Sequence, residues 1–239
     1  MQHPDSSSTP QGRSGQALKV DSPKRLLLID DHPIMRYGLA QLVADEEGLE
    51  ICGQAGTARE GLEAVGRIQP DLAVIDLTLP DKNGLELLKD IHAMHPGIQC
   101  LVLSMHDEAM YAERALRAGA RGYLMKEVAA EQFIHAVQKV LSGGIYLSEA
   151  MASRMLEQAV SGRARAVSTG MDLLSDRELE VMELIGSGKA TKIIAEQMGI
   201  STRTVEAHRA HIKEKLGLTD GAELVRYAVQ WAENSGRKA

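Results

Sequence analysis

Five short apolar segments alternate with five segments of helical periodicity between residues 25 and 141, and this alternation constrains the fold more than any other feature. The apolar segments are Arg25–Asp31, Leu49–Ala55, Leu72–Leu77, Ile98–Met105 and Gly122–Lys126. The helical segments lie near Ile34–Glu46, Ala58–Ile68, Gly84–Met94, Glu108–Ala118 and Ala130–Leu141. Strands that are apolar throughout are typical of a parallel sheet covered by helices on both faces. The pattern therefore predicts an α/β domain.

Right-handed crossovers between such strands predict a doubly wound, five-stranded sheet of the flavodoxin-like order 2-1-3-4-5. From Leu174 onward the strand pattern is replaced by four helical segments separated by glycines, which predicts a small all-α domain. The predicted divisions are a disordered leader (1–23), the α/β domain (24–147), a linker (148–171) and the helical domain (172–239).

The composition, with 44% hydrophobic and 25% charged residues, is ordinary for a soluble protein. No apolar run approaches the roughly 18 residues that span a bilayer, so we expect no membrane partner. The leader has no apolar core and does not resemble a signal peptide. Cys52 and Cys100 lie in apolar segments without metal-ligand spacing, which predicts buried free thiols and a cytoplasmic location.

The net charge of −6 is unevenly distributed. Residues 24–147 hold 12 Lys and Arg against 18 Asp and Glu, whereas residues 186–215 hold six against three. The acidity therefore belongs to the α/β domain, and a local excess of positive charge lies in the helical domain. This asymmetry permits binding to nucleic acid without establishing it.

Charged side chains stand where several predicted strands end. Asp30 and Asp31 end the first strand, Asp76 the third, Ser104 the fourth and Lys126 the fifth. Taken singly, such an aspartate is commonly a helix cap and such a lysine a solvated charge. However, the carboxyl ends of parallel strands meet at one sheet edge, so these side chains should converge. Converging carboxylates need a cation, and oxygen ligands favour Mg²⁺, with Mn²⁺ as the alternative.

Four segments resemble the signatures of receiver domains: Leu28–Pro33, Val74–Gly84, Val102–Ser104 and Gly119–Lys126. The resemblance runs in order through residues 24–147. It implies that Asp76 is the phosphoacceptor, that Lys126 pairs with the phosphoryl oxygens and that Ser104 hydrogen-bonds one of them. The implied Mg²⁺ ligands are Asp30, Asp31, Asp76 and the main-chain carbonyl of Thr78.

Tyr123 stands where receivers place a rotating aromatic residue. The resemblance implies that Tyr123 fills space vacated by Ser104 after phosphorylation; without it, an exposed tyrosine on a strand would be expected. Thr78 and His106 follow Asp76 and Ser104 by two residues, at positions that tune dephosphorylation in receivers. His106 is expected either to contact the phosphoryl group or to lie in a solvent-exposed loop.

The helical domain carries clear start and stop signals. Ser175-Asp-Arg-Glu178 is a capping box for its first helix, and Gly199-Ile-Ser201 predicts a turn with Ser201 or Thr202 as the next N-cap. Gly217 fits a left-handed helix terminus, and Thr219 is expected to start the last helix. The second helix should bury Ile193, Ile194, Ala195 and Met198, and the third Val205, His208, Ile212 and Leu216.

Residues 174–231 resemble the DNA-binding domain of LuxR-type regulators. A helix about 10–12 Å wide fits the major groove. The opposite surface of the third helix exposes Arg203, and the resemblance places Glu206, Ala207 and Ala210 against base edges, where Glu accepts from cytosine N4 and Ala packs on a thymine methyl. The expected phosphate contacts are Lys192, Thr202, Thr204, Arg209 and Lys213. The alternative is that these charges merely solvate a helical surface.

The two domains together resemble a two-component response regulator of the NarL/FixJ family. This implies a transcription regulator, not an enzyme beyond self-catalysed phosphorylation and dephosphorylation, switched by a sensor histidine kinase and bound to promoter double-stranded DNA. With so little positive charge a single copy should bind weakly, so phosphorylation is expected to promote a homodimer, through the first and fifth helices as in many relatives. The unphosphorylated receiver would mask the recognition helix or keep the chain monomeric.

Two other interpretations are open at this stage. Aspartates clustered on an α/β sheet also occur in phosphohydrolases, but those carry a second aspartate two residues after the nucleophile, where this chain has Thr78. A regulator with a vestigial receiver is the other interpretation, which the complete set Asp30, Asp31, Asp76, Ser104 and Lys126 disfavours. A dinucleotide-binding fold is excluded because Asp-Asp-His-Pro, instead of a Gly-rich turn, follows the first strand.

Overall fold

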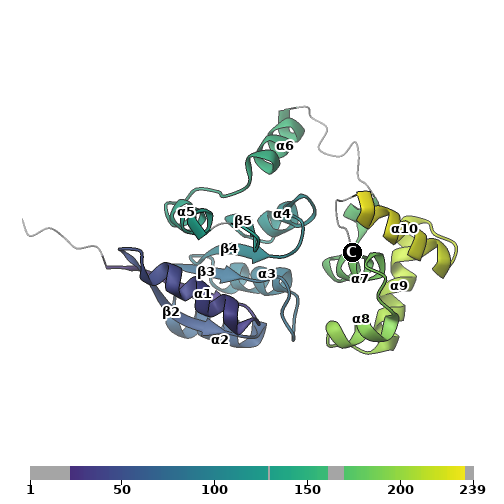
Figure 1. Ribbon diagram of the computed structural model, residues 1–239, viewed down its shortest axis with the longest axis horizontal. Coiled ribbons are helices and arrows are strands. Elements are labelled where there is room, and N and C mark those ends of the chain that lie inside the picture. The colour runs from purple at the N-terminus through teal and green to yellow at the C-terminus, as the bar shows by residue number, and fades with distance from the viewer. Residues whose placement is uncertain (1–21, 129, 161–169, 235–239) are drawn as a thin grey trace, which may run out of the picture.

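The computed structural model describes residues 22–128, 130–160 and 170–234 (Figure 1). Its strands are β1 (Lys24–Ile29), β2 (Leu49–Ala55), β3 (Leu72–Ile75), β4 (Gln99–Ser104) and β5 (Gly122–Met125). The first six helices are α1 (Pro33–Ala44), α2 (Ala58–Ile68), α3 (Gly84–Met94), α4 (Glu108–Arg117), α5 (Ala130–Leu141) and α6 (Glu149–Val160). Residues 1–21 of the predicted leader lie outside the described residues, and the predicted linker contains α6.

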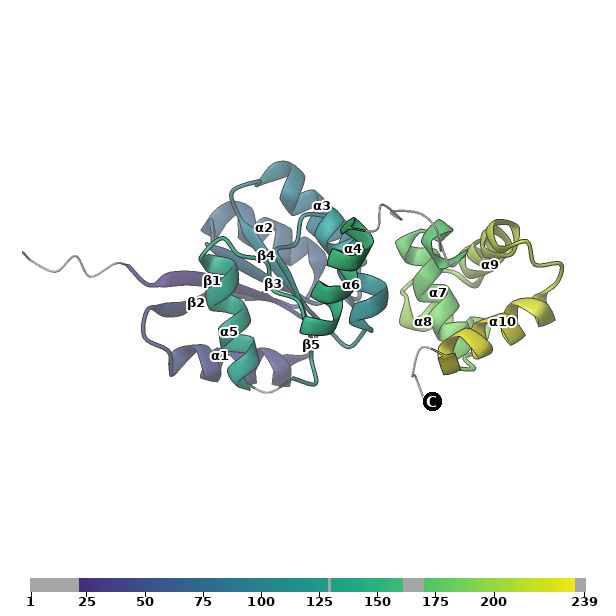
Figure 2. The same cartoon turned by 90° about the horizontal axis from the view of Figure 1, so that it is seen from above.

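The five strands form one parallel sheet of order β2-β1-β3-β4-β5, which confirms the predicted topology. Alternate residues of β1 pack on opposite faces. Leu26 and Leu28 join an apolar cluster with α1 and α5, whereas Leu27 and Ile29 join a second cluster with α2, α3 and α4. Figure 2 shows the sheet between these two helical layers. Both faces of the central strands are therefore buried, which explains why β3 and β4 are almost wholly apolar. The edge strand β2 is less buried and carries exposed Glu50 and Gln54.

The carboxyl ends of β1 and β3 come slightly earlier than predicted. β1 ends at Ile29 and β3 at Ile75, so that Asp30, Asp31 and Asp76 lie in the loops just beyond. The hydrogen bonding between β1 and β3 continues one residue further, since Asp76 N donates to the Ile29 carbonyl at 2.8 Å. The main chain at Asp30 and Asp76 is thus fixed by hydrogen bonds to neighbouring strands, and the candidate site lies at this edge of the sheet.

The C-terminal part is all helical: a 3₁₀ turn η1 (Gly170–Leu173), then α7 (Asp176–Gly186), α8 (Thr191–Gln197), α9 (Thr202–Leu216) and α10 (Gly221–Asn234). The capping box at Ser175 and Glu178 is present with both hydrogen bonds. Ser201 is the N-cap of α9, which ends at Gly217 in the left-handed region, with φ of 68°.

Two predictions for the helical domain are wrong. The last helix begins at Gly221 and not at Thr219, because the Asp220 carboxylate accepts from Glu223 N at 2.8 Å and caps the helix there. Ile193 was expected in the core, but its side chain is 44% exposed, since α8 spans only two turns and buries Ile194 and Ala195 instead. In the ranges that the structure describes, no helix is both long enough and apolar enough to cross a membrane.

Gly84, the first residue of α3, lies against the loop that carries Asp76. A Cβ added there would lie 2.2 Å from the Asp76 carbonyl oxygen and 2.6 Å from Leu77 Cα. We expect Gly84→Ala to displace this loop, to lower the free energy of unfolding by about 1–3 kcal/mol, as overpacking does, and to slow phosphorylation. Urea denaturation and acetyl phosphate labelling measure the two effects.

The matched control for that substitution is Gly97→Ala, in the turn before β4, where an added Cβ meets nothing within 4 Å. It should leave both quantities close to wild type. Equal behaviour of the two variants would show that the backbone contact at Gly84 is unimportant.

Candidate functional site

A buried ammonium group joins two strand ends at the carboxyl edge of the sheet. Lys126 Nζ lies 2.7 Å from Asp30 Oδ2 and 2.7 Å from Asp76 Oδ2. The side chains of Lys126, Asp30 and Asp76 are 4%, 5% and 2% exposed, so water screens these charges poorly. The side chains of β1, β3 and β5 thus converge as the sequence predicted.

Burial and charge act in opposite directions on this group. Burial raises the pKa of the Asp76 carboxyl, and the Lys126 ammonium only partly offsets that effect. Burial lowers the pKa of Lys126, but attraction to Asp76 and Asp30 outweighs it, so this pKa is raised. The two carboxylates therefore stabilise the charged form of Lys126, and the charged form of Asp76 in turn depends on positive charge nearby.

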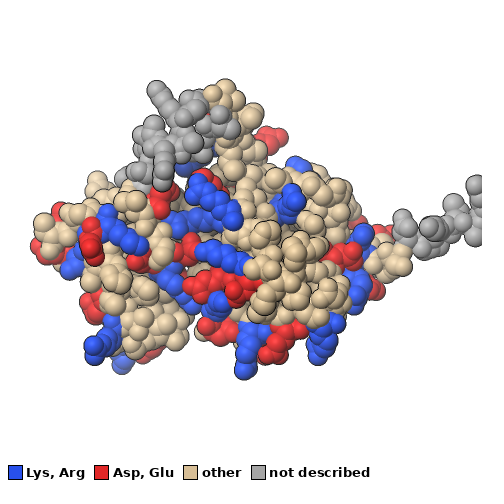
Figure 3. Space-filling view, turned by 180° about the vertical axis from the view of Figure 1, so that it is seen from behind, with Lys and Arg blue, Asp and Glu red and all other residues tan. Residues whose placement is uncertain are grey.

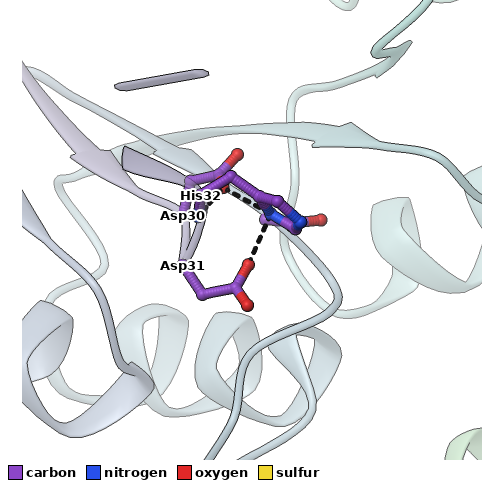
Figure 4. A group of neighbouring side chains, drawn as sticks. Asp30, Asp31 and His32 are labelled. Atoms are coloured by element: carbon purple, nitrogen blue, oxygen red, sulfur yellow. Dashed lines mark hydrogen bonds and ion pairs between the residues drawn. The ribbon is translucent and has the colours of Figure 1, made fainter. Parts of the chain in front are cut away.

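The same edge offers a set of metal ligands. Ligand atoms of Asp30, Asp31, His32 and Asp76 lie within 4.8 Å of one another. Figure 4 shows the His32 ring beside both neighbouring aspartates, with Nδ1 2.6 Å from Asp31 Oδ1 and 3.2 Å from Asp30 Oδ1. Buried and half-buried carboxylate oxygens are the donors that Mg²⁺ prefers, so the residues fit this ion. Thr78, whose carbonyl is the other predicted ligand, donates its N–H to Asp76 Oδ1 at 3.2 Å.

Sequence reasoning assigned no role to His32. The only available signal was its place directly after two aspartates. Periodicity could not show that its ring turns back onto them.

His106 lies at the centre of a small polar network in the loop after β4, next to the Asp76 loop. Its Nε2 is 3.2 Å from Thr78 Oγ1, its N–H donates to Ser104 Oγ at 3.2 Å, and its carbonyl accepts from the Tyr123 hydroxyl at 2.7 Å. The ring stacks on Tyr111 with centroids 4.6 Å apart. The His106 side chain is only 19% exposed, so the expectation of a solvent-exposed loop histidine is wrong.

Tyr123 is fully buried, which excludes the exposed strand tyrosine considered above. Ser104 is also fully buried. Both residues are hydrogen-bonded to the main chain of His106, so this one residue connects Ser104 to Tyr123.

Asp81 holds the loop after Asp76 against α2. Its carboxylate accepts from the N–H groups of Ala58 and Arg59, at 2.8 and 3.0 Å, and so places negative charge at a helix N-terminus. Burial favours the neutral carboxyl, but these hydrogen bonds outweigh it and lower the pKa of Asp81. Sequence analysis missed this role because the partners lie more than 20 residues away.

The helical domain contacts the receiver through α7 and the residues just before it. Arg114 of α4 donates to the carbonyls of Leu174 and Met171, at 2.8 and 2.7 Å, and pairs with Asp176 at 3.0 Å. Lys89 of α3 reaches the same aspartate at 2.8 Å. Acidic and basic side chains lie interleaved where the two parts meet (Figure 3).

Two further contacts connect α7 to the loops that follow β3 and β4. Asn83 Nδ2 donates to Glu180 at 3.0 Å, and His106 Nδ1 lies 2.8 Å from the buried carboxylate of Glu183. A histidine ring with its proton on Nδ1 satisfies both of its side-chain contacts, since it donates to Glu183 and accepts from the Thr78 hydroxyl. We refer to the contacts of Asn83, Lys89, His106 and Arg114 with residues 171–183 as the interdomain contact.

The predicted DNA-binding residues lie on α9 and at the start of α8. Those that face solvent are Lys192, Thr202, Arg203, Thr204, Glu206, Ala207 and Ala210, while Lys213 is half-buried. Arg209 differs from the expectation of an exposed phosphate contact: its side chain is 17% exposed and lies 3.6 Å from Glu206. The turn before α9 also lies against the α/β domain, since a Cβ added at Gly199 would lie 2.9 Å from the Pro80 carbonyl oxygen. The predicted base-facing side chains of α9 are nevertheless exposed, so they are not masked in this structure.

Comparison with known proteins assigns both parts of the chain. Residues 26–138 match the family described as "Response regulator receiver domain", and residues 172–228 match "Bacterial regulatory proteins, luxR family". The chain is 39% identical over 199 residues to the transcriptional regulatory protein UhpA of Escherichia coli, covering 83% of this chain and 94% of that protein. It is 34% identical over 211 residues to the transcriptional regulatory protein MctR of Rhizobium johnstonii, covering 88% and 95%.

Solved structures agree on the fold. A LuxR-family two-component response regulator from Aurantimonas is 32% identical, with a TM-score of 0.54 over 58% of this chain and 99% of that one. RcsB from Salmonella typhimurium aligns over 87% of this chain and 98% of its own, with a TM-score of 0.63 and 22% identity, which supports the fold alone.

The chain therefore belongs to the response regulators of the NarL/FixJ family, with a receiver domain and a LuxR-type helix-turn-helix. Such proteins regulate transcription under the control of phosphorylation. Similarity to transcriptional regulators over most of the chain disfavours the phosphohydrolase alternative.

We expect Asp81→Asn to lower the Tm at neutral pH. The lowered pKa of Asp81 means that its hydrogen bonds stabilise the fold above the ordinary value of 3.8 and are lost as the pH falls through the folded-state value. The difference from wild type should therefore shrink in acid, as thermal unfolding across a pH series would show. Phosphorylation by acetyl phosphate should also slow, because the loop after Asp76 loses its anchor.

The control is Glu47→Gln, a solvent-exposed carboxylate in the turn before β2. It should change neither the Tm profile nor the labelling rate. A constant Tm difference for Asp81→Asn at all pH values would contradict the charge-based explanation.

Proposed function

We propose that this chain is a DNA-binding transcriptional regulator whose affinity for promoter DNA is set by phosphorylation of Asp76 by a sensor histidine kinase. The observation that carries the proposal is the Lys126 ammonium held between Asp30 and Asp76, with Asp31 alongside. This arrangement concentrates positive charge at a buried nucleophilic carboxylate, as phosphoryl transfer requires.

In the proposed reaction an oxygen of Asp76 attacks the phosphorus of the kinase phosphohistidine. The new O–P bond forms as the P–N bond breaks, and its electron pair stays on the imidazole nitrogen. Lys126 then pairs with the phosphoryl oxygens, while Ser104 donates its hydroxyl to one of them. The residues that would hold Mg²⁺ are Asp30, Asp31, Asp76 and the carbonyl of Thr78, and the ion supplies further charge neutralisation when bound.

Movement of Ser104 toward the phosphoryl group would disturb the network around His106. The His106 N–H would lose its present acceptor, and the loop that receives the Tyr123 hydroxyl would shift. We assign Tyr123 the role of switch residue for this reason. The shift reaches the helical domain because His106 also contacts Glu183.

Charge gives the direction of the response. The α7 residues at the interdomain contact, Asp176, Glu180 and Glu183, are all acidic. Phosphorylation adds about −1.5 to −2 charges beside Thr78 and His106. This added charge repels the acidic helix, so phosphorylation should weaken the interdomain contact and free the helical domain to assemble on DNA.

We further propose that the freed chain binds as a homodimer, with α9 in the major groove. The proposed base-reading residues are Glu206, Ala207 and Ala210. The proposed phosphate contacts are Lys192, Thr202, Thr204 and Lys213, and Arg203 lies on the same DNA-facing surface. Two copies double the phosphate contacts that a weakly basic domain lacks. The receiver face that we assign to the partner copy is the groove between α1 and α5, which Leu42 and Ile134 line.

The phosphoacceptor itself is tested by Asp76→Asn. Wild type treated with acetyl phosphate and Mg²⁺ should take up one phosphoryl group, sediment as a dimer and bind its DNA site at least about tenfold more tightly, a coupling within the usual range. The variant should do none of these. Radiolabelling, sedimentation and footprinting give the three readouts.

Asp90→Asn, on α3, is the control and should behave as wild type, since Asp90 pairs with Lys82 at the surface. An Asp76→Asn variant that still dimerises and binds after treatment would overturn the proposal.

Arg114→Met tests the interdomain contact. It removes three contacts with residues 171–176 and keeps most of the side-chain volume. We expect the two domains to tumble more independently by NMR relaxation, and unphosphorylated protein to bind DNA several-fold more tightly, because the restraint is lost.

Arg117→Met is its matched control on the same helix, because Arg117 pairs with Glu113 within α4. It should leave both readouts unchanged. Independent tumbling of Arg114→Met without any gain in DNA binding would show that the contact does not restrain binding.

A further inference from the structure

An acidic side chain stands on the surface of α9 that faces DNA. Glu206 is 60% exposed there, in a stretch with only six basic residues against three acidic ones. A carboxylate so placed repels phosphates and lowers affinity for every DNA sequence. We therefore expect Glu206 to contribute to the choice between DNA sequences, which would compensate for the lost affinity.

The Glu206 carboxylate is held from two sides at one oxygen. The Thr191 hydroxyl donates to Glu206 Oε1 at 2.9 Å, and Arg209 Nε lies 3.6 Å from the same atom. Thr191 is the first residue of α8, so the contact joins the two helices of the helix-turn-helix. The second oxygen, Oε2, is left to accept a hydrogen bond from outside.

The hydroxyl of Thr191 is not needed as the helix cap, because Ala190 holds the N-cap position of α8. Its β-branched side chain is also stiff, so the hydroxyl has few alternative positions. Arg209 is itself largely buried and places a positive charge 3.6 Å from the same oxygen. Together the two neighbours restrict the rotamers of an otherwise exposed glutamate.

We propose that Thr191 is a specificity-determining residue, which orients Glu206 so that the domain selects cytosine at one base pair of its site. This inference rests on the proposed function, in which α9 lies in the major groove. Cytosine presents only its N4 amino donor there, whereas guanine and thymine present acceptors that repel a carboxylate. Adenine carries the N7 acceptor beside its amino group, so cytosine is the base that fits best.

On this recognition surface Glu206 would select the base, and Thr191 would fix the orientation of Glu206. The oriented carboxylate costs affinity at every site but costs least where an amino group meets it. Rejection of the other bases thus comes from repulsion and lost hydration as much as from the new hydrogen bond. Thr191 contributes by preventing the glutamate from rotating away to avoid that cost.

The test selects randomised duplexes with phosphorylated full-length protein and then measures binding to four duplexes that differ at the identified base pair. Wild type should prefer cytosine there by about tenfold, as expected for a charged hydrogen bond. Thr191→Val, which removes only the hydroxyl, should reduce the preference several-fold and leave the salt dependence unchanged. Thr191→Ser, which keeps a hydroxyl, should retain the cytosine preference. Glu206→Gln should abolish the cytosine preference while tightening binding to all four duplexes.

Thr219→Val is the matched control, because Thr219 also donates to a glutamate, Glu223 at 2.7 Å, but at the start of α10. It should leave the base preference intact, and the Tm of each variant shows whether it is folded. A folded Thr191→Val that binds with undiminished cytosine preference overturns the inference and leaves the proposed function standing. Wild type that binds none of the duplexes overturns the proposed function, and the inference with it.

Discussion

The Lys126 ammonium between two buried carboxylates is the interaction on which the receiver depends. Without it, Asp30 and Asp76 would face one another across a poorly hydrated sheet edge, where like charges repel strongly. Burial raises the pKa of the Asp76 carboxyl, so its carboxylate form needs positive charge nearby, which the Lys126 ammonium supplies. The two side chains therefore form a single unit. The topology makes this possible, since β1 and β3 are neighbours and β5 ends at the same edge.

A small number of side-chain contacts connect the Lys126–Asp76 pair and its loop to the helical domain. Thr78 and His106 link the phosphoacceptor loop to Glu183, and Asn83 links the same loop to Glu180. All receiver groups at this contact are basic or neutral donors, while the α7 groups are acidic. In the proposed function, negative charge gained at Asp76 would weaken this hold on α7.

Local patterns predicted the architecture well, and physical reasons explain what they missed. The apolar strands, the handedness rule and the capping box at Ser175 depend on near neighbours in the chain, and the structure agrees with each. Convergence of Asp30, Asp76 and Lys126 followed from the topology. By contrast, the partners of Arg114 lie about 60 residues away, and no local pattern encodes such a pairing. The limited exposure of Arg209 was also missed, although its partner Glu206 lies only three residues earlier on α9.

The low positive charge of the helix-turn-helix and the carboxylate of Glu206 act in the same direction. Both keep a single domain from binding DNA tightly at arbitrary sequences, because most nonspecific affinity comes from phosphate neutralisation. In the proposed function, discrimination would be gained twice, once from an oriented acidic side chain and once from the need for two copies at properly spaced half-sites. In the proposed function, occupancy of DNA follows the charge at Asp76. A weakly basic recognition surface suits that role, since a strongly basic one would bind DNA in either state.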